Sequence, residues 1–373
     1  MNFAFSEEQE LLRRSTRRFL DDRQQLAALR SRLEEPETLD RPSWREAAEL
    51  GWTSMLIPPR YEGGCVTDQP IVDLVVLGEE LGRCLHPGPF VPTNVVADAI
   101  ATWGTELQCE EWLGPIAHGE SLAAWCISRD GSIETGECGV VATCGDDSSV
   151  LNGVARFVHG AAAADLLLVL AHSGDGLVHV LVPTSTPGVA IRTQRSIDLT
   201  RRFGEVAFDG VTVASAQTLR ADADAVHSRA VDLATILQAA EAVGAADHLF
   251  SKTVEYLKVR MQFGRTIASF QAIKHRLADL LLSLEGMRAA THYAALAMND
   301  GFDDRSAAVS TAGSYVGESF AALCGEALQL HGGIGFTWEH DVHLFVRRAI
   351  TNKGLYGDPG WHRERLCAIA EVA

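Results

Sequence analysis

Apolar and polar positions along the chain follow three successive patterns. Up to about residue 118 the apolar residues recur at helical spacing, as Leu12 and Phe19 do near the start. Ser6, with Gln9 three residues later, is typical of a helix start closed by a capping box. We expect two further helices in this part, each ended by a glycine: 44–50 ended by Gly51, and 71–81 ended by Gly82.

The middle of the chain has a β pattern. Five short apolar runs alternate with turn residues: 122–127, 139–143, 166–171, 178–182 and 204–208. The dipeptides Asn152-Gly153 and Asp209-Gly210 are typical of hairpin turns. The regular spacing of these runs predicts a small antiparallel barrel or sandwich.

The last part returns to helical spacing. Long helices are predicted over 231–257, 270–298 and 306–330, and their many small residues favour close packing in a bundle. The predicted fold class is therefore α+β. It has an N-terminal helical domain over 1–118, a middle antiparallel β-barrel or sandwich domain over 119–220, and a C-terminal four-helix bundle over 221–373.

Charge and composition exclude several classes of partner. The chain has 32 Lys and Arg against 49 Asp and Glu, a formal net charge of −17, which argues against nucleic acid or an anionic membrane surface as a partner. We find no apolar run of about 18 residues and no signal-peptide core, so we expect a cytoplasmic protein. Its eight cysteines form no CxxC pair, and no metal site is predicted.

Two segments could carry binding chemistry. In the first, Arg260 ends a long helix before Phe263 and Gly264, and Gln271 follows after the turn. An arginine there can pair with a phosphate. An ordinary helix C-terminus also favours a cation and then a glycine, so the residues alone leave both interpretations open.

The second segment runs from Gln329 through Gly332-Gly333 to Phe336. Paired glycines after a helix can bring bare backbone close to a ligand. They also occur in ordinary loops between helices, and a glycine cluster alone does not decide between the two.

Taken together and in this order, the RxxFG…FQ and QxxGGxGF segments resemble the motifs of the acyl-CoA dehydrogenase family. The resemblance covers nearly the whole chain. In that family these motifs hold FAD across a subunit interface. The resemblance therefore implies FAD as cofactor and an acyl-CoA as substrate, with electron-transfer flavoprotein as a possible acceptor. The FAD contacts it implies are Arg260, Phe263, Gln271, Gln329 and Gly333.

The flavin-facing part of the β region departs from the family pattern. Where the family carries a TEPxxGSD-like strand, this chain reads Ser128-Arg129-Asp130, which keeps only the hydroxyl of Ser128. Phe157 and His159 stand where the family has a tryptophan and a hydroxyl residue. The resemblance thus implies a β domain that folds but whose flavin-facing chemistry has changed.

The catalytic glutamate of the family is also missing. Its usual segment reads Tyr356-Gly357-Asp358 here, and its alternative position falls on Ala234. Glu241 lies seven residues beyond Ala234 and is the only glutamate of the apolar run 235–243. A salt-bridged or interface glutamate explains Glu241 more simply than catalysis does. We therefore predict no catalytic residue in this chain.

The chain thus keeps the FAD-binding motifs but lacks the base. In this it resembles the β subunits of the α2β2 acyl-CoA dehydrogenases of actinobacterial steroid side-chain degradation, of the 3-oxocholest-4-en-26-oyl-CoA type. In these enzymes a related α subunit shares each site. Two other hypotheses stay open. One is a self-sufficient homotetramer that uses Glu241 or Asp358 as base, and the other is a non-enzymatic structural or regulatory protein.

Overall fold

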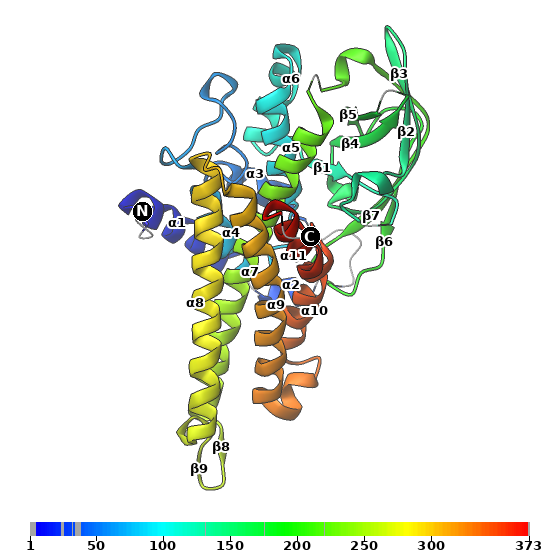
Figure 1. Ribbon diagram of the computed structural model, residues 1–373. Helices are drawn as coiled ribbons and strands as arrows, with labels where there is room; N and C mark the ends of the chain where they lie inside the picture. Colours follow the sequence, from blue (N-terminus) through cyan, green and yellow to red (C-terminus); the bar gives the residue numbers. More distant parts are fainter. Residues whose placement is uncertain are drawn as a thin grey trace. The chain divides into compact units, whose positions relative to one another are not determined.

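The computed structural model describes residues 5–23, 26–31, 33, 39–130, 132–174, 176–219 and 221–371. Its elements follow the predicted order of helices, strands and helices (Figure 1), so the three-part fold class is confirmed. The contacts divide the chain into two compact units. The helical unit comprises residues 1–30, 74–86 and 235–373, and the β unit comprises 31–73 and 87–234. The boundaries predicted at 118 and 220 stay a prediction. Within the described residues, no helix has the length and apolarity needed to cross a membrane.

The β unit contains one mixed sheet with short helices. The helices that lie within it are α3 (Arg41–Ala48), α5 (Phe90–Trp103) and α6 (Glu106–Ala117). The strands are β1 (Ala123–Cys126), β2 (Val140–Cys144), β3 (Ser148–His159), β4 (Leu166–Ser173), β5 (Gly176–Pro183), β6 (Val189–Gln194) and β7 (Phe203–Ala214). Their order is β1-β4-β2-β3-β7-β6, and β5 pairs with β4. The sheet is largely antiparallel, but β4 pairs in parallel with β1 and, at one point, with β2.

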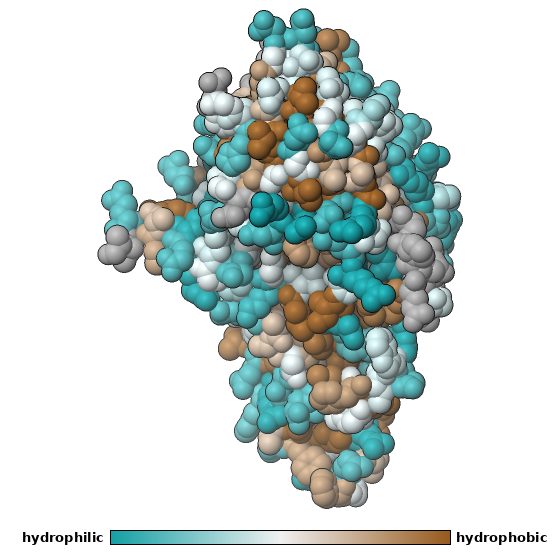
Figure 2. Space-filling view, turned by 90° about the vertical axis from the view of Figure 1, so that its right-hand side faces the viewer, coloured by the Kyte–Doolittle hydropathy of each residue, from teal (hydrophilic) through white to brown (hydrophobic). Residues whose placement is uncertain are grey.

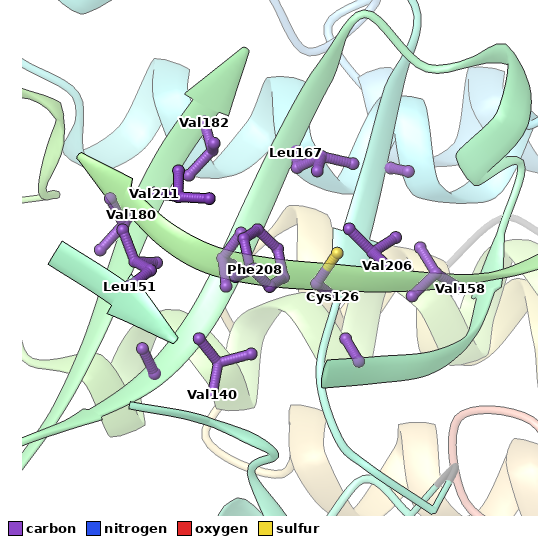
Figure 3. Packing of buried hydrophobic residues seen from close by; sticks show 14 of the residues in the cluster. Cys126, Val140, Leu151, Val158, Leu167, Val180, Val182, Val206, Phe208 and Val211 are labelled. Atoms are coloured by element: carbon purple, nitrogen blue, oxygen red, sulfur yellow. The ribbon is translucent and has the colours of Figure 1, made fainter. Parts of the chain in front are cut away.

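Alternating apolar residues of these strands form the core of the β unit. Figure 3 shows this core, in which Leu151 and Phe208 lie close to side chains from neighbouring strands. The period of two along each strand turns every second side chain inward, which is why short apolar runs marked the strands in the sequence. Residues of these runs such as Leu167 and Val206 have no exposed surface.

The prediction of hairpin turns at the two dipeptides is wrong. Asn152-Gly153 lies within β3 and Asp209-Gly210 lies within β7. The two dipeptides face each other at a register shift between these strands, and the Gly210 N–H donates to Asn152 Oδ1 at 2.8 Å. They therefore form a β-bulge, which needs the same positive φ from glycine as a turn does.

The helical unit consists of helices of different lengths, of which α7, α8 and α9 are the longest. They are α1 (Glu7–Arg23), most of α2 (Leu26–Ser31) and of α4 (Pro70–Arg83), the larger part of α7 (Ala223–Val259), α8 (Gln271–Asn299), α9 (Arg305–His331), α10 (Val342–Gly354) and α11 (Pro359–Ile369). The predicted capping box is confirmed, because Ser6 Oγ accepts from the Gln9 N–H at 3.2 Å and Gln9 Oε1 accepts from the Ser6 N–H at 3.0 Å. Helix α1 is joined to α4 by an ion pair between Arg13 and the buried Glu79 at 2.9 Å.

Gly82 does not end its helix, contrary to the prediction, because α4 continues to Arg83. A Cβ built on Gly82 would lie 1.9 Å from the backbone oxygen of Glu241 on α7, and one on Gly244 of α7 would lie 1.7 Å from the backbone oxygen of Glu79. These glycines therefore serve close helix–helix approach rather than a helix end. Each glycine is needed because of a helix that is distant in sequence, so the residues around the glycine do not reveal its role.

Candidate functional site

The first candidate segment is a tight hairpin between two long helices. Strands β8 (Met261–Gln262) and β9 (Arg265–Thr266) pair after α7 ends, and the short helix η5 (Ile267–Ser269) leads into α8. The turn uses positive φ angles at Phe263 (53°) and Gly264 (74°). The Ile267 N–H donates to the Arg260 backbone oxygen at 2.9 Å and closes the loop. The hairpin therefore carries Arg260 at its start and Phe263 at its tip, and Gln271 follows it.

The second candidate segment follows the last turn of α9. Gln329 lies on that turn, and the short helix η6 (Gly332–Phe336) continues from it. Gly332 turns the backbone with φ 64°, and a Cβ built on Gly333 would meet no atom within 4 Å. The backbone at Gly333 is therefore open to a ligand, as the paired-glycine interpretation requires.

Side-chain contacts join the two segments. Tyr256, one turn before Arg260 on α7, stacks on His331 at the end of α9, with ring centroids 4.6 Å apart and planes at 18°. Its hydroxyl also donates to the backbone oxygen of His331 at 3.3 Å. Two residues separated by 75 positions in sequence are thus brought together at one end of the helical unit.

The polar side chains of these segments point outward. Arg260, Gln271 and Gln329 are exposed, and within the described part of the chain no group pairs or hydrogen-bonds with their side chains. Two neighbouring cations differ, since Arg276 pairs with Glu326 at 2.8 Å and Arg265 lies over the Phe270 ring at 3.9 Å. A guanidinium, two amides and an open backbone are the groups that bind a diphosphate and its attached sugar, so these residues fit the FAD that the resemblance implies.

Apolar side chains lie beside these polar groups. Phe263 is 93% exposed, and Val259 and Met261 are also exposed. Figure 2 shows apolar side chains at the lower end of the view, which is the end that carries the hairpin in Figure 1. An aromatic ring held this far into solvent is available for contact with a ligand or another chain.

The flavin-facing positions of the β unit are arranged differently. Ser128, two residues after β1, is buried, and its backbone oxygen accepts from the Arg156 N–H at 3.0 Å. Phe157 lies in a bulge of β3 with φ 55° and is 47% exposed. His159 is buried, with its ring 5.6 Å from that of Phe203. Two of the three positions are therefore turned into the unit.

The positions of Glu241 and Asp358 do not indicate that either residue acts as a catalytic base. Glu241 is buried where α7 approaches Gly82 of α4. Asp358 is exposed and caps α11, because its Oδ1 accepts from the Trp361 N–H at 2.7 Å. An N-cap role explains why an aspartate precedes this helix without any catalysis.

Tyr256 and His331 did not emerge from the sequence as site residues. The sequence did place each of them near a motif, since Tyr256 lies one helical turn before Arg260 and His331 lies inside the second motif. Their positions in the sequence did not show that the two rings are in contact. The described residues contain no cluster of histidine, cysteine and carboxylate groups that could hold a metal.

Comparison with known proteins finds matches to two domain models and to relatives of similar length. Residues 6–120 match the N-terminal domain of the acyl-CoA dehydrogenase family, and residues 225–368 match its C-terminal domain. The acyl-CoA dehydrogenase IpdE2 of Mycolicibacterium smegmatis is 30% identical over 361 residues, which cover 97% of this chain and 98% of that protein.

Two solved structures extend this comparison. A structure described as a variant of the Tcur3481-Tcur3483 steroid ACAD has a chain that is 29% identical, with a TM-score of 0.88 and 98% coverage of both chains. A chain of the ChsE4-ChsE5 complex from Mycobacterium tuberculosis is 25% identical, with a TM-score of 0.89 and 100% coverage of both. The first description names two components, Tcur3481 and Tcur3483, and the second names a complex of ChsE4 with ChsE5.

Proposed function

The chain belongs to the acyl-CoA dehydrogenase family, whose members use FAD, and from this premise we propose that it is one subunit of a heteromeric enzyme of that family. The observation that carries the proposal is the contrast between two sets of residues. The polar groups for FAD are present and outward-facing at the hairpin and after α9. The family's catalytic glutamate and several flavin-facing groups are replaced.

The hairpin and the end of α9 form what we call the clamp: Arg260, Phe263, Gln271, Gln329 and Gly333. Arg260 neutralises diphosphate charge, and its planar fork can donate two parallel hydrogen bonds. The amides of Gln271 and Gln329 add uncharged donors, and Gly333 permits close approach of backbone. All these groups are exposed on the helical unit, which suits a cofactor carried by a neighbouring subunit.

The missing base supports a partner subunit. When bound, FAD accepts the hydride that leaves the β-carbon of the acyl group. The α-proton must be removed by a carboxylate held in a dry site. Here the two family positions hold Ala234, which has no ionisable group, and the segment of Asp358, which caps a helix. A related acyl-CoA dehydrogenase α subunit, in an α2β2 assembly, would supply this carboxylate.

Relatives support the substrate class that we propose. The Tcur3481-Tcur3483 structure is described as a steroid ACAD, and 29% identity over 98% of the chain supports a related substrate. We therefore propose that the complex introduces an α,β double bond into a steroid side-chain acyl-CoA derived from cholesterol. Electron-transfer flavoprotein is the acceptor that the family resemblance implies.

Flavin content of the purified protein tests the proposal. The chain is produced alone and together with a related acyl-CoA dehydrogenase subunit, and visible flavin absorbance and acyl-CoA oxidation are measured for both. We expect little flavin and no oxidation from the lone chain, and both from the complex. A lone chain that retains stoichiometric FAD and oxidises acyl-CoA contradicts the heteromeric role.

The homotetramer hypothesis makes the opposite prediction and can be tested in the same assay. If the lone chain is active, Glu241→Gln and Asp358→Ser identify which carboxylate serves as base, since each change removes a carboxylate and keeps a polar side chain. Loss of turnover with FAD retained would assign the role. No observation on the described residues favours either group over a structural one.

A further inference from the structure

Tyr256 and His331 hold the two segments of the clamp together. We propose that they are positioning residues for cofactor binding, acting through Arg260 on one side and through Gln329 and Gly333 on the other. The inference rests on the proposed role of the clamp in binding FAD. It assigns a function to two residues that are not themselves among the predicted FAD contacts.

Tyr256 is coupled directly to Arg260. The Arg260 N–H donates to the Tyr256 backbone oxygen at 2.9 Å, so the two residues share the last helical hydrogen bond before the hairpin. This bond makes them part of one helical turn, so a shift of that turn when the Tyr256 ring loses its contact with His331 changes the direction in which the helix presents Arg260. A hydrogen bond is lost when donor and acceptor move about 1 Å beyond their usual separation, so a displaced Arg260 binds a diphosphate more weakly.

His331 is coupled to the second segment by its place in the chain. It lies two residues after Gln329 and two before Gly333. Its ring is buried, and its Nδ1 lies 2.8 Å from the Ala327 backbone oxygen. That bond requires a proton on Nδ1 and fixes the plane of the imidazole. Burial lowers the pKa of His331, so the ring is neutral at pH 7 and stacks on Tyr256 as an uncharged surface.

A third ring supports this stack from the loop that follows η6. The His340 ring lies 4.6 Å from that of His331, tilted by 60°. His340 is itself oriented by the Val342 N–H, which donates to its Nδ1 at 3.3 Å. The three rings thus run from the end of α7, across the end of α9, to the start of α10.

Little else supports these rings on one side. Tyr256, His331 and His340 form part of the wall of a cavity of about 570 Å³. Packed side chains therefore cannot fix the rings from that direction. The relative placement of the two clamp segments then depends on the ring contacts and on the Tyr256 hydroxyl, which is the arrangement expected of positioning residues.

The same cavity provides a matched control. His248 of α7 stacks on Phe345 of α10, with ring centroids 5.7 Å apart and planes at 15°. This pair also joins α7 to another helix, but neither residue adjoins a clamp residue. A change at His248 should therefore cost stability of the helical unit without affecting the cofactor.

The experiment compares Tyr256→Leu with His248→Leu in the complex of this chain and its partner subunit. FAD is titrated into each apo complex, and the FAD dissociation constant, the flavin spectrum and Tm are recorded. We expect Tyr256→Leu to raise the dissociation constant about tenfold and His248→Leu to change it less than about twofold, at comparable losses of Tm. Tyr256→Phe, which keeps the ring, should recover most of the lost affinity.

Equal FAD affinity in the Tyr256→Leu complex and the wild type overturns the inference, and so does an equal loss in the His248→Leu complex. Should Tyr256→Leu not fold, Tyr256→Met fills the space without a ring and is expected to show the same loss. Arg260→Ala separates this inference from the proposed function. If Arg260→Ala leaves FAD affinity unchanged, the clamp itself is refuted. If only Arg260→Ala weakens binding, the positioning role alone is refuted.

Discussion

The clamp and the flavin-facing positions of the β unit use their side chains in opposite ways. In the clamp, Arg260 and Gln329 face solvent with no intramolecular partner among the described residues. In the β unit, Ser128 and His159 are buried. Both regions keep the family fold, but only the clamp keeps groups free to bind a ligand. The comparison teaches that a fold can persist over the whole chain while the exposure of its polar groups differs from one region to the other.

The largest effect should come from removing the charge of the clamp. If the proposed function holds, Arg260→Ala in the complex with the partner subunit deletes a charge-assisted hydrogen bond to a diphosphate, worth about 2 kcal/mol, or roughly 30-fold in the FAD dissociation constant. Fluorescence titration of the apo complex with FAD measures it. Arg276→Ala is the matched control, because Arg276 is an exposed cation of the same helical unit that is already paired with Glu326. If both variants bind FAD equally, the clamp has no special role.

A second test perturbs the β unit and leaves the clamp unchanged. His179 of β5 is buried, and burial lowers its pKa to about 3. Between pH 6.5 and 3 the unfolded chain therefore binds a proton at this residue that the folded chain excludes, so folding stability falls as the pH falls. At pH 5 this amounts to about 2 kcal/mol relative to pH 7.5.

His179→Phe should remove that part of the acid sensitivity. Urea unfolding at pH 7.5 and pH 5 measures the difference in the free energy of unfolding, and the variant should show a difference smaller by about 2 kcal/mol than the wild type. FAD affinity of the complex at pH 7.5 should stay the same. An altered FAD affinity would mean that the β unit of this chain does take part in cofactor binding, which would weaken the contrast between the two regions.

The smallest effect concerns Asp358, where the question is whether the helical unit contains a base. Asp358→Ala should lower the free energy of unfolding by about 1 kcal/mol through loss of the cap of α11, and Asp358→Ser should restore most of it because serine also caps. Acyl-CoA oxidation by the complex should be retained in both. Loss of oxidation in the serine variant, with stability kept, would make Asp358 the base and remove the need for a partner's glutamate.

Local patterns in the sequence predicted much of the fold. The capping box at Ser6 and the long helices of the last third emerged because their causes lie within a few residues of each other. Asn152-Gly153 and Gly82 were misassigned for the opposite reason. Each glycine responds to a segment far along the chain, a facing strand in one case and the backbone at Glu241 in the other.

For the candidate site, too, some features could be predicted from the sequence and others could not. The clamp residues lie in short motifs, so the family resemblance could name them as candidates. Their exposure and their lack of intramolecular partners among the described residues could not be predicted. The contact of Tyr256 with His331 spans 75 positions and depends on how two helices end beside each other. Pairing of this kind follows from tertiary packing, which helical periodicity in the sequence does not predict.

The hairpin tip has a thermodynamic consequence. Phe263 adopts a left-handed backbone conformation that costs a non-glycine residue about 1 kcal/mol, and its ring gains almost no burial in return. A molecule that covers this ring binds only the folded chain and so shifts the folding equilibrium by mass action. The melting temperature of this protein should therefore rise with the concentration of whatever covers Phe263, whether cofactor or neighbouring chain.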